Sequence, residues 1–204
     1  YGVPYPGTFM LDARGRVVAR YFEAAYQERN TVSSILSRQG VAGMGPAVTV
    51  RTAHLAVQAA ASDQIVSPGS RLSLTIDVAP APGMHVYAPG ATGYRVIAFT
   101  MAPQPFLHPQ PLAYPESEIY HFEPLDERVP VYQKPFRLVQ DVTLAGDLAT
   151  QKQLRGRDAI TISGTLEYQA CDDRLCFNPA SVPLSWTLSL KPIVSGRPAR
   201  RESQ

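Results

Sequence analysis

The 204-residue sequence contains only two cysteines and one tryptophan, and charged residues make up just 18% of it. Positive and negative charges nearly balance at a formal net charge of +2, and the lysines and arginines form no basic stripe. Because nucleic-acid binding needs concentrated positive charge, we expect no nucleic acid among the partners. No apolar run approaches the roughly 20 residues that a membrane-spanning helix requires, so we expect no membrane span.

Motifs of several common enzyme classes are also missing. The sequence has no phosphate-binding glycine loop and no serine nucleophile elbow, and its four histidines lack the spacing of metal ligands. We therefore expect no cofactor and no resident metal ion. The acidic residues between positions 116 and 127 are interpreted as a solvated stretch, because paired acid–base carboxylates need a geometry that spacing alone does not establish.

Turn-forming residues are abundant instead, with 19 prolines and 14 glycines. Apolar and polar residues alternate over 71–80, 159–169 and 181–190, which is typical of strands with one buried face. At least six such candidates and little helix predict a mainly β fold, an immunoglobulin-like β-sandwich over residues 48–191. The proline-rich stretch 102–135 is interpreted as a long excursion across one end of the sandwich.

The first 40 residues have a different pattern. Residues 8–12 and 16–22 predict a β-hairpin, and the stretch up to Gly40 predicts a helix with Asn30 or Thr31 as its N-cap. Residues 41–47 are interpreted as a linker, and residues 192–204 as a disordered tail. Tyr1 stands where an initiator methionine is expected. We therefore expect the chain to be part of a longer protein, from which a signal peptide could have been lost.

The two cysteines, Cys171 and Cys176, are separated by only four residues in the segment YQACDDRLCFNP. A disulfide across so short a loop stabilises a fold by roughly 2 kcal/mol in the chain-entropy model, toward the low end of the usual range. Structural disulfide, redox-active pair and metal ligation all remain open on this spacing. Two thiols without nearby ligands make a poor zinc site, however.

The charges around the pair bear on its chemistry. Asp172 and Asp173 disfavour a thiolate at Cys171, while Arg174 partly offsets them. The pair is thus better suited to being attacked as a disulfide than to acting as a strong free nucleophile. Cys171 is the cysteine that we expect to form the mixed disulfide with a partner.

Several residues near the pair have two possible interpretations. His85 is interpreted as a strand-edge side chain with a local hydrogen bond, the alternative being a role near the cysteines. Six aromatic residues could form a surface that docks a partner, or could be core residues and loop anchors. These six are Tyr87, Tyr94, Tyr114, Tyr120, Phe122 and Tyr132.

The segment YQACDDRLCFNP, followed by VPLSWTL, resembles the cysteine segment of the N-terminal periplasmic domain of DsbD-type thiol:disulfide interchange proteins. PGMHVYAPG and LDERVPVY also resemble that family, and the resemblance covers about residues 48–191. It implies an immunoglobulin-like domain in the periplasm, or an otherwise extracytoplasmic compartment. Its cysteine pair would take electrons from a thioredoxin-like partner and pass them to oxidised periplasmic proteins.

The same resemblance implies site residues. Cys171 and Cys176 would be the active pair, and a loop that caps the disulfide would match the region from Asp126 to Val129. The best-known form of the family has one more residue between its cysteines, and its cap presents an aromatic residue that this chain offers only at Tyr132. The implied supporting or capping residues are Tyr168, Asp126, Glu127, Arg128, Val129, Tyr132 and Phe177.

The first 23 residues, YGVPYPGTFMLDARGRVVARYFE, resemble the last third of a redoxin or peroxiredoxin-like thioredoxin-fold domain. The resemblance implies that residues 1–40 are the C-terminal remnant of such a domain and that Pro6 is the cis-proline beside its catalytic cysteine. That cysteine would lie upstream.

Together these observations predict a protein-disulfide reductase-like module that works through reversible exchange at the cysteine pair. The alternative is a non-enzymatic binding or scaffolding sandwich with a structural disulfide. A third option, a metal-chaperone sandwich that uses cysteine, histidine and Met84, predicts copper binding by the reduced form.

Overall fold

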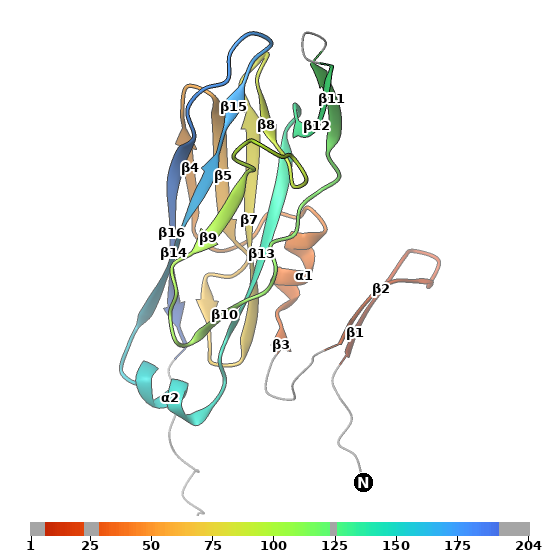
Figure 1. Ribbon diagram of the computed structural model, residues 1–204. Coiled ribbons are helices and arrows are strands. Elements are labelled where there is room, and N and C mark those ends of the chain that lie inside the picture. Colours follow the sequence, from red (N-terminus) through yellow and green to blue (C-terminus); the bar gives the residue numbers. More distant parts are fainter. Residues whose placement is uncertain (1–6, 23–28, 123–125, 192–204) are drawn as a thin grey trace, which may run out of the picture.

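Two packed β-sheets form the body of the computed structural model, which describes residues 7–22, 29–122 and 126–191 (Figure 1). The larger sheet has the strand order β10–β13–β7–β5–β4, with β3 pairing with β7. The facing sheet has the order β6–β16–β14–β9. The strands of the larger sheet are β3 (Arg29–Asn30), β4 (Ala47–Arg51), β5 (Leu55–Ala61), β7 (Ser70–Pro80), β10 (Leu107–Pro109) and β13 (Phe136–Leu144). Those of the facing sheet are β6 (Ile65–Val66), β9 (Ala98–Met101), β14 (Ala159–Tyr168) and β16 (Ala180–Leu190).

The hydrophobic core lies between these two sheets, as the alternating sequence pattern requires. On β16 every second residue from Val182 to Leu190 is buried, and Trp186 packs edge-on against Phe99 of β9. The opposite side chains of β16 are exposed, which is the signature of a strand with one face on a core. The predicted mainly β, immunoglobulin-like sandwich is confirmed.

Strand β7 departs from the one-face expectation, because Ser73 and Thr75 on its second face are also buried. Helix α1 (Val32–Arg38) covers that face. Thr31 is the N-cap, and its side chain accepts a hydrogen bond from the amide of Ser34. At the other end of the helix, Arg38 contacts Asp141 of β13 through an ion pair of 2.9 Å. The segment from β3 to α1 is therefore packed against the sandwich.

The predicted N-terminal hairpin is present as β1 (Gly7–Leu11) and β2 (Val17–Phe22). Its turn is closed by the carboxylate of Asp12, which accepts hydrogen bonds from the amides of Arg14 and Arg16. Pro6 and the tail 192–204 lie outside the described residues, so the predictions about them stay predictions, as do the proposed domain boundaries.

A third, smaller sheet lies at one end of the sandwich and has the order β11–β12–β8–β15 (Figure 1). Its strands are β8 (His85–Tyr87), β11 (Glu118–Phe122), β12 (Glu127–Tyr132) and β15 (Ala170–Cys171). The proline-rich excursion supplies two of them, including β12, which has neighbours on both sides. Pro130 lies at the end of the β8–β12 ladder, where its carbonyl accepts a hydrogen bond from the amide of Ala88. The carbonyl of Ala88 accepts from the amide of Ala91, so the missing proline amide leaves no carbonyl unpaired there.

The remaining helix, α2 (Leu148–Leu154), links β13 to β14 at the opposite end. Asp147 caps it by accepting hydrogen bonds from the amide and hydroxyl of Thr150. No helix in the described parts of the chain is long and apolar enough to cross a bilayer.

Candidate functional site

The two cysteines lie on a tight hairpin that continues from β15 and are joined by a disulfide. Backbone bonds hold the hairpin on both sides of the pair: the amide of Phe177 donates to Ala170 O at 2.9 Å, and that of Asp172 donates to Leu175 O at 3.0 Å. Cys171 and Cys176 face each other between these two bonds as an antiparallel bridge. Opposed residues in such a pair are close even without a covalent link.

The carboxylate of Asp172 shapes the four-residue turn. It accepts the amide hydrogens of Arg174 at 2.8 Å and of Leu175 at 2.7 Å. These two backbone bonds, that of Arg174 above all, hold the pKa of Asp172 below its ordinary value. From sequence, Asp172 was expected only to disfavour a thiolate at Cys171, and the structure adds its role as the acceptor that closes the turn.

The two sulfur-bearing residues differ strongly in exposure. Cys171 is paired with His85 across β8 and β15 and is only 1% exposed, whereas Cys176 on the returning strand is exposed to solvent. Cys176 is therefore the more accessible residue of the pair. The expectation that Cys171 forms the mixed disulfide is not favoured by this difference, and the order of attack stays a prediction.

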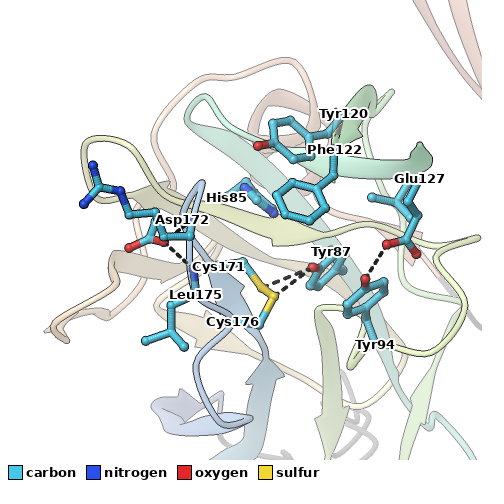
Figure 2. A pocket seen from close by; sticks show the side chains of 12 residues that line it. His85, Tyr87, Tyr94, Tyr120, Phe122, Glu127, Cys171, Asp172, Leu175 and Cys176 are labelled. Atoms are coloured by element: carbon cyan, nitrogen blue, oxygen red, sulfur yellow. Dashed lines mark hydrogen bonds between the residues drawn. A yellow bond between two sulfur atoms is a disulfide. The ribbon is translucent and has the colours of Figure 1, made fainter. Parts of the chain in front are cut away.

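A cavity of about 180 Å³ opens beside the disulfide (Figure 2). Strands β8, β11 and β12 and the loop after β8 surround it, and the cysteine hairpin closes it. Its lining is largely aromatic and includes an exposed basic residue, Arg174. The residues that line it are His85, Tyr87, Tyr94, Tyr120, Phe122, Glu127, Val129, Cys171, Asp172, Arg174, Leu175 and Cys176.

Tyr87 is the aromatic residue in contact with the disulfide. Its hydroxyl oxygen lies 3.1 Å from Cys171 Sγ and 3.3 Å from Cys176 Sγ (Figure 2). Its ring stacks on that of Tyr94, with 3.9 Å between centroids, and the Tyr94 hydroxyl donates to Glu127 Oε2 at 2.6 Å. Burial raises the pKa of Tyr87, and the hydrogen bond to Glu127 raises that of Tyr94, so both hydroxyls stay protonated.

His85 also faces the pair from β8. Its ring is buried and lies 4.6 Å from that of Tyr120, whose hydroxyl donates to Asp173 Oδ1 at 3.0 Å. Burial lowers the pKa of His85 below its ordinary value, against the opposing influence of Asp173 and Asp172. The imidazole is consequently neutral at neutral pH. His85 thus lies beside the cysteines on a strand with neighbours on both sides, and a role in their chemistry stays a prediction.

The predicted capping region divides into two parts. Glu127 and Val129 line the cavity, and Val129 is buried with Tyr87 and Cys171. Asp126 and Arg128 do not line it, and Asp126 instead contacts His121 at 2.7 Å. The aromatic side chains of the cap come from β11, as Tyr120 and Phe122. Both are among the six aromatic residues that the sequence offered as a possible docking surface, but it did not place them in the cap, because β11 belongs to the proline-rich excursion.

The three other predicted supporting residues lie away from the cavity. Tyr168 is in the main core, where its hydroxyl contacts that of Thr52 at 3.0 Å. Tyr132 stacks on Phe136 and is not in the cap, contrary to the expectation that it is the cap's aromatic residue. Phe177 follows Cys176 and packs against His54 with 4.3 Å between ring centroids.

Metal ligation finds no support in the described residues. Among 7–22, 29–122 and 126–191, no group of three or more His, Cys, Asp or Glu side chains is arranged to hold a metal ion. The two cysteines are oxidised to a disulfide, and His85 is the histidine that lines the cavity beside them.

Fold and site together define an immunoglobulin-like sandwich that presents a disulfide at one end. Residues 52–183 match the family model described as thiol:disulfide interchange protein DsbD, N-terminal, and the chain belongs to this family. The predicted resemblance to DsbD-type N-terminal domains is thereby confirmed over residues 52–183. Among curated proteins none matches the chain.

Two solved structures are similar at low identity. The N-terminal periplasmic domain of ScsB from Proteus mirabilis is 15% identical with a TM-score of 0.47, and the match covers 71% of this chain and 50% of that one. The DsbD N-terminal domain of Neisseria meningitidis, in its reduced form, is 16% identical with a TM-score of 0.39, over 57% and 81%. The chain thus spans half the length of the ScsB structure. Likenesses at this level carry no part of the argument that follows.

Proposed function

We propose that this chain is a thiol–disulfide exchange module that relays reducing equivalents through Cys171 and Cys176. The donor would be a thioredoxin-like protein, and the acceptors oxidised proteins of the periplasm or another extracytoplasmic compartment. Family membership supports the type of chemistry. An oxidising compartment is where a disulfide of this kind persists.

The observation that carries the proposal is the unequal exposure of the two cysteines. A bond with one exposed and one buried residue presents a single sulfur to an incoming thiolate and keeps the other as the internal leaving group. A structural role is less well supported, because the backbone bonds of the hairpin already hold these neighbours together.

The exchange proceeds in two balanced steps. A thiolate of the reduced partner attacks Cys176 Sγ, the Cys171–Cys176 bond breaks, and Cys171 leaves as a thiolate that carries the electron pair. The second thiolate of the partner then attacks the partner's own sulfur in the mixed disulfide and releases Cys176 as a thiolate. The partner is oxidised and the module reduced by two electrons. Transfer to an oxidised protein runs the same steps in reverse.

Trapping of the mixed disulfide tests this assignment. Cys171→Ala leaves the exposed Cys176 without its internal partner, so it should accumulate a mixed disulfide with a thioredoxin-like protein. Cys176→Ala is the matched control and should trap little, because its remaining cysteine is buried. If neither variant accumulates a mixed disulfide, the relay is refuted and a binding or scaffolding sandwich is favoured.

The reduction potential gives an independent measurement. Structural disulfides have potentials below about −300 mV, and a relay is expected above that value. Equilibration of the pair with glutathione or thioredoxin buffers would decide between the two ranges. A potential within the structural range would leave the scaffold as the better account.

We also propose that hairpin β1–β2 is the end of a redoxin-like, thioredoxin-fold domain. The support is the sequence resemblance, including Pro6, and the exposure of apolar side chains such as Phe9 and Phe22 on an isolated two-stranded sheet. Such a ribbon is marginally stable alone. The gene sequence upstream of Tyr1 tests this: a thioredoxin-fold domain with its cysteine is expected there, and its absence would refute the proposal.

A further inference from the structure

Tyr87 places a hydrogen-bond donor at the position where negative charge forms during exchange. Its hydroxyl oxygen lies 3.1 Å from Cys171 Sγ and 3.3 Å from Cys176 Sγ. The sulfur of an intact disulfide is only a weak acceptor. A thiolate is charged, and hydrogen bonds to charged groups are about twice as strong as those between neutral groups. The contact therefore gains most of its strength once the disulfide opens.

The thiolate of Cys171 needs such a donor. Cys171 is 1% exposed, and removal from water disfavours its charged form. The carboxylate of Asp172 is adjacent in the chain, and neutral His85 is opposite it on β8. The titratable and charged groups around the sulfur, from every element that lines the cavity, are His85, Tyr87, Tyr94, Tyr120, Glu127, Asp172 and Arg174.

The donor is held in place before the reaction begins. Tyr87 is 3% exposed, and its ring stacks on Tyr94 with planes 13° apart. Tyr94 is in turn fixed by its hydrogen bond to Glu127 of β12. A donor that is already oriented spends little free energy on reorganisation when charge develops, which is the basis of oxyanion-hole catalysis.

We propose that Tyr87 is a catalytic residue, whose hydroxyl donates a hydrogen bond to the Cys171 thiolate released when Cys176 is attacked. The electron pair of the broken S–S bond stays on Cys171 Sγ, and the proton stays on the tyrosine oxygen. In the reverse direction the same bond keeps Cys171 ionised until it attacks Cys176 Sγ. This inference rests on the proposed function for the order of attack.

The test measures the ionisation of Cys171 with no partner present. In the Cys176→Ala background, Cys171 is the sole thiol, and its thiolate is followed by ultraviolet absorbance against pH. Adding Tyr87→Phe keeps the ring and removes only the hydroxyl. We expect the thiolate-to-thiol ratio at a given pH to fall about tenfold, the effect of one hydrogen bond to a charged group.

Tyr132→Phe in the same background is the matched control. It removes a buried tyrosine hydroxyl from the same small sheet, one that donates to Pro115 O and is distant from the sulfurs. The thiolate ratio should be unchanged in this control. An unchanged ratio in Tyr87→Phe, or an equal fall in both variants, would overturn the proposal.

A second measurement leaves Tyr87 intact and covers the case in which Tyr87→Phe does not fold. In the Cys176→Ala protein, the NMR signal of the Tyr87 ring carbon that bears the hydroxyl should shift with the same midpoint pH as the Cys171 thiolate. A Tyr87 signal that does not shift at the midpoint pH of Cys171 ionisation would also overturn the proposal. A relay that fails with every thioredoxin-like protein, while this titration responds as expected, would refute the proposed function alone.

Discussion

At the scale of single residues, the two cysteines have unequal surroundings because one precedes the turn and the other follows it. Cys171 ends a strand whose neighbour is β8, so its side chain lies against His85 and Tyr87. Cys176 stands after the turn, where no further strand covers it, and it remains exposed. The same chemical group is therefore accessible at one position and buried at the other, as the proposed order of attack requires.

His85 makes the stability of the fold depend on pH. Burial lowers its pKa in the folded protein below the value of about 6.5 in the unfolded chain. Because the unfolded chain then binds more protons, the stabilising contribution is fully present above pH about 6.5 and is lost as pH falls through the lower folded pKa. We expect the free energy of unfolding to decrease over this acidic window.

Urea unfolding at a series of pH values measures this dependence. His85→Gln should flatten the decrease, since glutamine does not titrate. The same replacement at His108, an exposed residue of β10, controls for the loss of a histidine elsewhere. Equal pH dependence in wild type and His85→Gln would contradict the assignment.

At the scale of elements, the cysteine hairpin combines a reactive bond with a backbone that survives its cleavage. The bonds from Phe177 to Ala170 and from Asp172 to Leu175 do not involve sulfur. They keep the two thiols close after reduction, which favours fast reclosure of the ring and a short-lived mixed disulfide. The turn that Asp172 closes is thus expected to set how readily the pair reoxidises.

Two replacements of Asp172 distinguish the effect of its hydrogen bonds in the turn from the effect of its negative charge. Asp172→Ala removes the acceptor for the amides of Arg174 and Leu175, whereas Asp172→Asn keeps an acceptor oxygen and removes only the charge. We expect the equilibrium constant for forming the disulfide from the dithiol, measured against glutathione, to fall several-fold in the alanine variant. The asparagine variant should stay nearer to wild type.

Asp173→Ala provides the control for a lost carboxylate on the same hairpin. Asp173 accepts a hydrogen bond from Tyr120 and is not an acceptor within the turn. Its replacement should leave the glutathione equilibrium close to that of wild type. If Asp172→Ala and Asp172→Asn change the equilibrium equally, charge is responsible and the turn is not.

At the scale of the whole molecule, the alternation of apolar and polar residues predicted the sandwich well. The residues of the site were predicted only in part. Strands β14 and β16 occupy the predicted segments 159–169 and 181–190, because one face of each lies on the core. The small sheet was missed because its strands are short and two of them, β11 and β12, lie within the proline-rich excursion. Its pairing also depends on contacts distant in sequence, such as that between Tyr87 and Cys171, 84 positions apart.

The second buried face of β7 was hidden for a related reason. Ser73 and Thr75 have the polarity of a solvent-facing set, and only the packing of α1 makes them interior residues. Polar pairing permits this burial: the Ser73 hydroxyl donates to Asp141 at 2.6 Å, and Arg38 forms an ion pair with the same carboxylate. A sequence pattern does not reveal which segment will cover such a face.

Because helix α1 covers β7, the sandwich is expected to begin before this helix, and this domain boundary can be measured. A version of the protein that begins at residue 23 keeps β3 and α1, and one that begins at residue 41 loses them. The shorter version exposes the face of β7, removes buried Ile35 and leaves Asp141 without Arg38. From the burial of one isoleucine and the loss of this ion pair, we expect it to be less stable by about 2–4 kcal/mol.

Chemical denaturation of both versions beside the full chain gives the comparison. The version from residue 23 should unfold at nearly the same denaturant concentration as the full chain, since hairpin β1–β2 has little packing against the sandwich core. Equal stability of the versions from residues 23 and 41 would place the sandwich boundary at the predicted linker, 41–47. A difference of the expected size would place it before β3, because the sandwich needs α1 to close the second face of its central strand.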